Sequence, residues 1–163
     1  QATNRIDFNS AIAITNPNVS LSAEAGDVIN VNAAINVNSG GITLTANNQL
    51  NLNNSLTSGS GNVTLTATNG TVSLGSSINV TTGNVTVDGP VTLTTGGGNI
   101  ATASGGINFS SRSSIDGNQP LRLNATGGVI QFNNRVGSTT PLASLTINTG
   151  STLTSSTNLD VTV

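Results

Sequence analysis

The sequence predicts a right-handed parallel β-helix, or β-solenoid, of about seven turns with about three short strands in each turn. The segment at 61–82 (GNVTLTATNGTVSLGSSINVTT) is followed directly by a related segment at 83–104 (GNVTVDGPVTLTTGGGNIATAS). Both begin with glycine and an apolar–polar–apolar triplet, and short strands that recur every roughly 20–25 residues are typical of stacked coils. The right hand follows from the usual chirality of parallel crossover connections.

The same pattern predicts that residues 1–163 form one rod, without a linker or a second domain. The segment 23–39 is shorter than the others, and we interpret it as a turn that lacks part of one corner. The expected repeats lie near 1–22, 23–39, 40–60, 61–82, 83–104, 105–127, 128–150 and 151–163.

Alternation of apolar and polar residues predicts strands throughout the chain, separated by glycine, asparagine and serine or threonine turns. Valine and leucine should point inward and threonine outward, with Val63 stacked between Ile42 and Val85. Strands are expected at 6–8, 11–14, 19–21, 28–31, 34–37, 42–46, 50–52, 63–67, 72–74, 78–80, 85–87, 91–93, 107–109, 121–125, 129–132, 142–147 and 159–163.

The composition excludes several classes of function. Only 6% of the residues are charged, against about 25% in an ordinary soluble protein. Cysteine and histidine are absent, so there is no disulfide framework or thiolate metal site, and we expect no cofactor. Arginine supplies all four positive side chains, which leaves no basic face for nucleic acid. No apolar run approaches the roughly 18 residues of a membrane span, so membrane insertion is not expected.

The acidic residues predict no catalysis. Six carboxylates are spread over the chain, and without histidine, cysteine, lysine or tyrosine they act alone as acids or bases. Arg112 and Asp116 lie on one turn, and we interpret them as a surface ion pair. A polysaccharide-degrading β-helix enzyme remains as a third hypothesis.

Three arginines form a candidate contact for an anionic glycan or protein partner. Arg112 (SSRSSI) and Arg135 (NNRVGS) occupy equivalent places one repeat apart, and Arg122 lies on the same repeat as Arg112. The alternative is a solvated corner in which Asp116 relieves the repulsion between the arginines.

Paired threonines raise a second hypothesis, an ice-binding or glycan-binding solenoid module. Thr43 and Thr45 should stack on Thr64 and Thr66 as a flat array, but the next turn places Asp88 in that plane. Ordinary β-propensity explains the same pairs. Thermal hysteresis measurements would separate ice binding from a purely structural role.

The repeats GNVTLTATNGTVSL, GNVTVDGPVTLTTGGGNI and TTPLASLTINTG resemble those of bacterial filamentous haemagglutinin-type exoproteins, from about Gly40 to Val163. That resemblance implies a β-helical adhesin secreted through an outer-membrane partner, and hence a rod at the bacterial surface or outside the cell. The Asn-Pro-Asn motif of that family's secretion domain is followed by glycine, whereas here Val19 follows Asn18. Residues 1–22 are therefore not interpreted as that domain.

Both ends of the predicted rod lack a charged or helical cover. Open strands are a template for further strands, so we expect either end-to-end assembly with other copies or continuation of a longer rod. The assembly strands would contain Ile6 and Phe8 at one end, and Leu159, Val161 and Val163 at the other.

Overall fold

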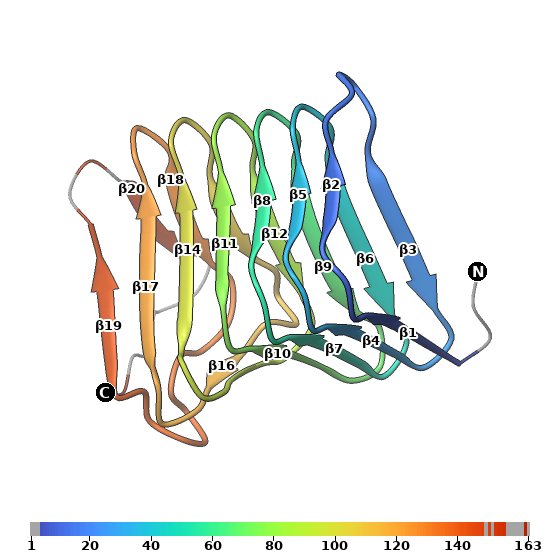
Figure 1. Ribbon diagram of the computed structural model, residues 1–163. Helices are drawn as coiled ribbons and strands as arrows, with labels where there is room; N and C mark the ends of the chain where they lie inside the picture. Colours follow the sequence, from blue (N-terminus) through green and yellow to red (C-terminus); the bar gives the residue numbers. More distant parts are fainter. Residues whose placement is uncertain (1–3, 149, 151, 156–161, 163) are drawn as a thin grey trace.

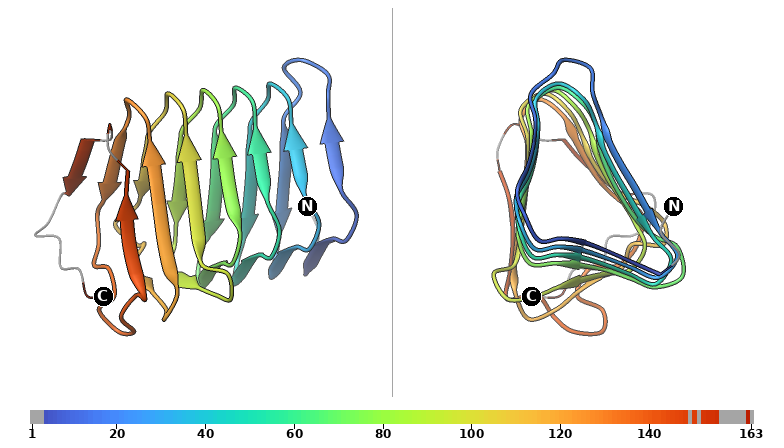
Figure 2. Two further views of the ribbon diagram at one scale, coloured as in Figure 1. Left: turned by 60° about the vertical axis from the view of Figure 1, so that its left-hand side comes forward. Right: turned by 45° about the vertical axis from the view of Figure 1, so that its right-hand side comes forward.

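The protein is a β-solenoid with no regular element other than strands in the part of the chain that is described. The computed structural model describes residues 4–148, 150, 152–155 and 162. Its strands form three parallel sheets, two of seven strands and one of six. In Figure 1 the chain rises along the strands in front, crosses the top and descends behind while it advances from right to left, which is a right-handed path. Figure 2 shows the triangular outline of the turns. The predicted fold is confirmed.

Each of the first six turns contributes one strand to each sheet in the order sheet 1, sheet 2, sheet 3, and the last turn contributes β19 and β20 to sheets 2 and 3. Sheet 1 contains β1 (Arg5–Phe8), β4 (Val28–Val31), β7 (Gln49–Leu52), β10 (Thr71–Leu74), β13 (Val91–Leu93) and β16 (Ile115–Asp116). Sheet 2 contains β2 (Ile12–Ile14), β5 (Ile35–Val37), β8 (Leu56–Ser58), β11 (Ser77–Val80), β14 (Gly98–Thr102), β17 (Pro120–Ala125) and β19 (Ser144–Ile147). Sheet 3 contains β3 (Leu21–Ala25), β6 (Ile42–Ala46), β9 (Val63–Ala67), β12 (Val85–Asp88), β15 (Ile107–Phe109), β18 (Val129–Phe132) and β20 (Thr152–Ser155).

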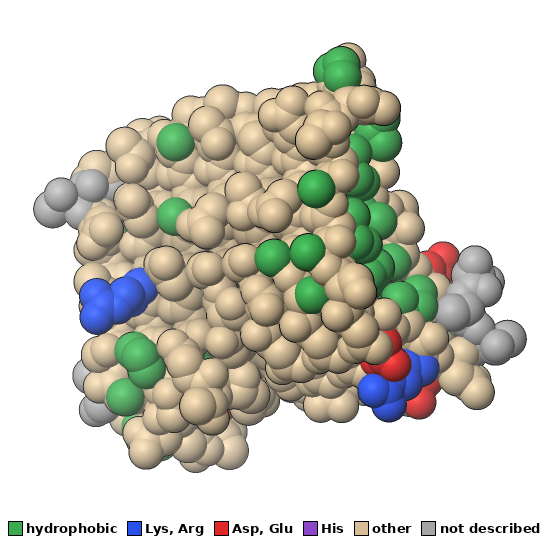
Figure 3. All heavy atoms as spheres, viewed as in Figure 1, with side chains coloured by type: hydrophobic (Ala, Val, Ile, Leu, Met, Phe, Trp, Pro, Cys, Tyr) green, Lys and Arg blue, Asp and Glu red, His purple; other side chains and the backbone are tan. Residues whose placement is uncertain are grey.

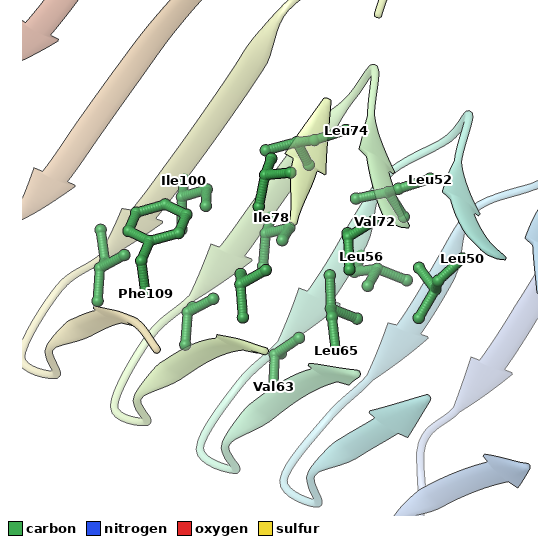
Figure 4. Packing of buried hydrophobic residues seen from close by; sticks show 14 of the residues in the cluster. Leu50, Leu52, Leu56, Val63, Leu65, Val72, Leu74, Ile78, Ile100 and Phe109 are labelled. Carbon is green, nitrogen blue, oxygen red and sulfur yellow. The ribbon is translucent and has the colours of Figure 1, made fainter. Parts of the chain in front are cut away.

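The core consists of apolar columns that run along the rod. Val63 pairs with Ile42 on one side and Val85 on the other, as expected from the repeat. These side chains are fully buried, and the threonines between them face outward. Figure 4 shows labelled side chains of neighbouring turns, among them Leu50, Val72 and Leu74, projecting from their strands into the interior. Phe109 and Phe132 stack in one column with ring centroids 5.3 Å apart and ring planes within 2°. Parallel in-register stacking therefore brings like side chains together.

Strands β8, β14, β16 and β20 lie where the alternation in the sequence is weak, and they were not predicted. The inward positions of β8 and β14 include Ser58, Gly98 and Thr102 in place of aliphatic residues. The buried hydroxyl of Ser58 donates to the carbonyl oxygens of Gly40 and Gly61 at 2.9 and 2.8 Å, so a polar residue is accommodated in the core.

The expected short turn at 23–39 is wrong. Leu21 pairs with Ile42, so that turn begins before residue 23 and contains the full set β3, β4 and β5. Val19 and Ser20 stand where the next turn has Gly40 and Gly41, so this turn lacks the glycine that marks the start of the later repeats. The strand expected at 159–163 lies outside the described residues, apart from Thr162.

The glycine that opens each repeat is required by close stacking at the corner between sheets 2 and 3. A Cβ atom on Gly61 would lie 2.2 Å from the carbonyl carbon of Gly40, and one on Gly83 would lie 2.2 Å from the carbonyl oxygen of Gly61. Gly105 and Gly128 meet the preceding glycine in the same way. The corners thus touch backbone to backbone, and no side chain fits between them.

We expect Leu65→Asp to destabilise the rod strongly and Thr64→Asp to have little effect. Leu65 is fully buried and Thr64 faces outward on the same strand. An unpaired charge in the core costs about 3–5 kcal/mol, whereas an exposed substitution usually stays within about 0.5 kcal/mol. Denaturant unfolding monitored by circular dichroism measures both. Equal losses would mean that the strand has the opposite register.

Gly83→Ala should also destabilise the protein, because its Cβ would overlap the backbone of Gly61. Overpacking of this kind costs about 1–3 kcal/mol. The neighbouring Thr82→Ala is the matched control, since Thr82 is exposed. If the two variants melt at the same temperature, close stacking does not explain the glycine corner.

Candidate functional site

Arg112 and Asp88 form the main charged cluster on the body of the rod, at the corner that follows sheet 3. Thr86 pairs with Asn108, so Asp88 lies one turn before the loop that carries Arg112. The Nε and Nη2 atoms of Arg112 donate to the two oxygens of Asp88 at 2.9 and 2.5 Å. Its Nη1 donates to the carbonyl oxygen of Thr68 at 2.6 Å, another turn away. One guanidinium therefore joins three successive turns.

Two serines hold the loop of Arg112 in place. The Ser110 hydroxyl donates to Asp88 Oδ1 at 2.6 Å, and the buried Ser113 hydroxyl donates to the carbonyl oxygen of Val87 at 2.8 Å. The backbone amide of Arg112 donates to Ser110 Oγ. The sequence SSRSS is thus a local network that orients the arginine toward the preceding turn.

The electrostatics of this pair favour its charged form. The hydrogen bonds from Arg112 hold the pKa of Asp88 below its usual value, with a smaller contribution from Ser110 and opposition from partial burial. Asp88 in turn raises the pKa of the Arg112 guanidinium. Because both partners are partly exposed, the pair contributes modestly to stability. Each charge is satisfied by the other, so the pair acts as a structural contact between turns.

The expected ion pair between Arg112 and Asp116 is wrong. Asp116 lies beyond the corner in sheet 1, where its Oδ1 accepts hydrogen bonds from the backbone amides of Thr139 and Thr140 at 2.7 and 3.1 Å. The guanidinium instead turns back toward Asp88, which lies below it on the neighbouring turn.

The three candidate arginines lie on two parts of the surface. Asn134 donates to the carbonyl oxygen of Ser111, which places Arg112 and Arg135 at the same corner on successive turns. Arg122 is an exposed residue on the outer face of β17 in sheet 2. The structure therefore brings Arg112 and Arg135 together and leaves Arg122 apart, and Asp88 already pairs with Arg112.

The predicted threonine array is present on the outer face of sheet 3. Thr43 pairs with Thr64 and Thr45 with Thr66. On the next turn Asp88 pairs with Thr66 and carries the bound guanidinium of Arg112. The regular array thus covers two turns before a charged pair interrupts it.

Asparagine ladders cover the outer face of sheet 1 and its corner, and they were not predicted. Asn51 donates to Asn30 Oδ1, and Asn30 donates to Asp7 Oδ1, each at 2.7 Å. Beside it, Asn53 donates to Asn32 at 2.9 Å, and Asn32 donates to Asn9 at 2.8 Å. In both ladders every amide donates toward the N-terminal end of the rod. The signal was present in the sequence as asparagines that recur at the repeat spacing.

Asp7 ends one of these ladders beside Arg5 on β1. Its Oδ1 accepts hydrogen bonds from Asn30 Nδ2 and from Arg5 Nε, both at 2.7 Å. These two hydrogen bonds, that of Asn30 first, hold the pKa of Asp7 below its usual value. Both side chains are exposed, 61% for Arg5 and 29% for Asp7.

Shallow depressions on the described surface are lined by uncharged residues. Two adjoining shallow depressions share Thr57 on the outer face of sheet 2, and uncharged residues line both of them. In the described part of the chain, no group of three or more acidic, histidine or cysteine residues is placed to hold a metal ion. The described residues also include no helix long and apolar enough to cross a membrane.

The candidate assembly strands are described at one end only. Ile6 and Phe8 lie in β1 and pack against the core while remaining half-buried. Leu159, Val161 and Val163 lie outside the described residues. Figure 3 shows the exposed end beside β1, β2 and β3 as a band of hydrophobic side chains on the right-hand edge of the molecule.

Comparisons with protein-family models, curated proteins and solved structures found no match. The resemblance to filamentous haemagglutinin-type repeats therefore stays a hypothesis that depends on the repeat sequences.

The contribution of the Arg112–Asp88 pair should depend on pH. Because the folded pKa of Asp88 is depressed, the stabilisation is complete above the unfolded value of about 4 and is lost as the pH falls through the folded value. Asp88→Asn should cost up to about 1 kcal/mol at neutral pH and nothing at the lowest pH. Urea unfolding at several pH values measures the difference.

Arg112→Ala should show the same pH-dependent loss, since it removes the other half of the pair. Arg122→Ala is the control, because Arg122 forms no ion pair among the described residues. A constant difference between wild type and Asp88→Asn at all pH values would contradict this assignment.

Proposed function

We propose that this chain is a structural and interaction rod of a secreted bacterial adhesin or extracellular filament, and that it performs no catalysis. The rod would act at the cell surface or outside the cell, and its main partner would be another set of β-solenoid turns, with host or matrix glycans as further partners. The resemblance of the repeats to filamentous haemagglutinin-type exoproteins supports the location.

One observation carries the proposal: among the described residues, no strands cover the apolar interior on the outer side of the first turn. Six inward side chains of that turn pack against the core but stay half-buried, whereas their equivalents in the next turn are almost completely buried. The half-buried residues are Ile6, Phe8, Ile12, Ile14, Leu21 and Ala23. A further layer of strands would bury them in the same way as each turn buries its neighbour.

The backbone of the first turn supports the same proposal. Strands β1, β2 and β3 are each the terminal strand of a sheet, so each has one edge without a neighbouring strand in the described part of the chain. Unpaired amide and carbonyl groups along three edges form a template for β-augmentation.

The surface of the rod supports a role in assembly and adhesion in preference to chemistry. Threonine, serine and asparagine form most of the outer faces, and Arg112 is already paired with Asp88. With no histidine, cysteine, lysine or tyrosine in the sequence, general acid–base catalysis would depend on isolated carboxylates.

We expect the 163-residue chain to associate end to end at micromolar concentration. Sedimentation velocity should show weight-average mass rising with concentration. Hydrogen exchange should show that association protects the amides of β1, β2 and β3 that donate to no neighbouring strand in the single chain. Ile12→Asp, which places a charge on the open interior, should abolish association. Ala13→Asp is the matched control because Ala13 is exposed on the outer face of the same strand.

Circular dichroism checks that both variants keep the fold. A compact monomer at all concentrations, with protected amides in β1, β2 and β3, would overturn the proposal.

A further inference from the structure

The chain contains a single Asn-Gly pair, Asn69-Gly70, at the corner that joins β9 to β10. Asparagine is one of the thermolabile residues of proteins. Its side-chain amide is lost when the backbone nitrogen of the next residue attacks it. Glycine hinders this attack least, because it has no Cβ atom and restricts the backbone least. The pair is therefore the strongest candidate in the sequence for spontaneous modification.

The corner that contains this pair is longer than the same corner of the next turn. The chain advances seven positions from Leu65 to Val72. It advances only four from Val87 to Val91, the residues that pair with those two. Three residues of the longer corner therefore have no equivalent in the next turn. Asn69 is exposed, so water reaches its side chain.

The backbone nitrogen of Gly70 is not held by the preceding turn. The amides of Thr68, Asn69 and Thr71 donate to carbonyl oxygens of that turn at 3.0, 2.7 and 2.9 Å. Among the described residues, the amide of Gly70 donates to no acceptor, and Gly70 is partly exposed. The nitrogen that would attack the side chain of Asn69 therefore lacks the hydrogen bonds that hold its neighbours, and solvent can reach its proton.

The two Asp-Gly pairs of the chain differ from it in this respect. Asp88-Gly89 and Asp116-Gly117 could form the same cyclic imide by loss of water. The glycine amide of the first pair donates to the buried Ser113 Oγ at 3.3 Å, and that of the second donates to the carbonyl oxygen of Thr140 at 3.1 Å. The next turn thus holds both of these nitrogens, and Asn69-Gly70 remains as the reactive pair.

One contact with the preceding turn restrains the side chain of Asn69. Its Nδ2 donates to Asn47 Oδ1 at 2.7 Å. Nδ2 is the atom that leaves as ammonia, so this hydrogen bond has to break during the reaction. Asn47 therefore slows the loss of the amide, and its effect depends on the stacking of the two turns.

We propose that Asn69 is a site of spontaneous deamidation in the folded rod, and that Asn47 controls the rate. The backbone nitrogen of Gly70 loses its proton and bonds to Cγ of Asn69. The bond from Cγ to Nδ2 breaks, and Nδ2 takes up a proton and leaves as ammonia. Water then opens the cyclic imide at one of its two carbonyl carbons, which gives aspartate or isoaspartate. Water is the only co-reactant, and no group is oxidised or reduced.

The products differ from the native chain in charge, and one of them differs in backbone length. A carboxylate in place of the amide adds one negative charge to a formal net charge of −2. It lies one residue from Thr68, whose carbonyl oxygen accepts a hydrogen bond from Arg112 Nη1 at 2.6 Å. Isoaspartate also inserts one carbon atom into the backbone of the corner. Ion exchange therefore separates both products from the native chain.

Incubation of the folded protein at mildly alkaline pH tests the site. Ion-exchange chromatography measures the acidic variant, and mass spectrometry of peptic peptides locates the mass gain that a carboxylate in place of an amide causes. Asn69 should be modified before any other asparagine. Asn69→Gln should remove the early acidic variant, because glutamine would have to form a larger ring, and Asn69→Asp supplies the elution standard.

Asn47→Ala tests the control of the rate. It removes the acceptor that holds Nδ2 of Asn69, so the rate of deamidation should rise several-fold. Asn53→Ala is the matched control, because it removes a similar hydrogen bond, from Asn53 to Asn32 at 2.9 Å, at a different corner. It should leave the rate unchanged. Circular dichroism checks that both variants keep the fold.

Modification of another asparagine as fast as Asn69, or of Asn69 only after unfolding in urea, would overturn the site. Equal rates in wild type and Asn47→Ala, or equal acceleration by Asn47→Ala and Asn53→Ala, would overturn the control by Asn47. None of these outcomes depends on end-to-end association, so the proposed function is tested separately.

Discussion

Every feature of this rod depends on the parallel, in-register stacking of each turn on the turn before it. The sequence between sheet 3 strands is almost constant in length, so residue pairs such as Ile42 with Val63 and Val63 with Val85 recur along the axis. Stacking is what buries the inward side chains, since one turn alone encloses no core. The stability of the rod is therefore a sum of contacts between neighbouring turns, and a turn with one neighbour has half of the contacts of a turn with two.

The same constraint explains the composition of the chain. Any residue type that repeats in a column meets its own kind about 4.8 Å away. A column of charges would repel itself at that distance, whereas an asparagine amide donates to the residue below and accepts from the residue above. The ladder of Asn30 and Asn51 shows this solution. Charges are accepted where donors bind them, as Asn30 and Arg5 bind Asp7, or where an opposite charge is one turn away, as at Asp88.

The fold could be predicted because periodicity reports directly on stacking. Val63, Leu65 and their neighbours keep the alternation of a strand and the spacing of a turn at the same time. Strand β14 was missed because Gly98 and Thr102 occupy inward positions there, and the partner of Arg112 was missed because proximity along the chain was given more weight than proximity along the axis. Contacts between turns follow from the register. The spacing of about 22 residues between turns therefore predicts that Arg112 pairs with Asp88 and not with Asp116.

The glycine corner, between sheets 2 and 3, differs from the other two corners in how much the number of residues varies from turn to turn. From Val37 to Ile42, Ser58 to Val63, Val80 to Val85 and Thr102 to Ile107 the chain advances five positions each time. In the first turn, which has Val19 and Ser20 where the next turn has Gly40 and Gly41, the chain advances seven positions from Ile14 to Leu21. The corner between sheets 1 and 2 advances four positions from Leu74 to Ile78 but seven from Leu93 to Ile100. Where glycine stacks on glycine, from Gly40 to Gly128, the backbone contact leaves no room for an extra residue. Loops that contact new partners can therefore be inserted at the other two corners. The stacked glycines keep successive turns aligned with one another.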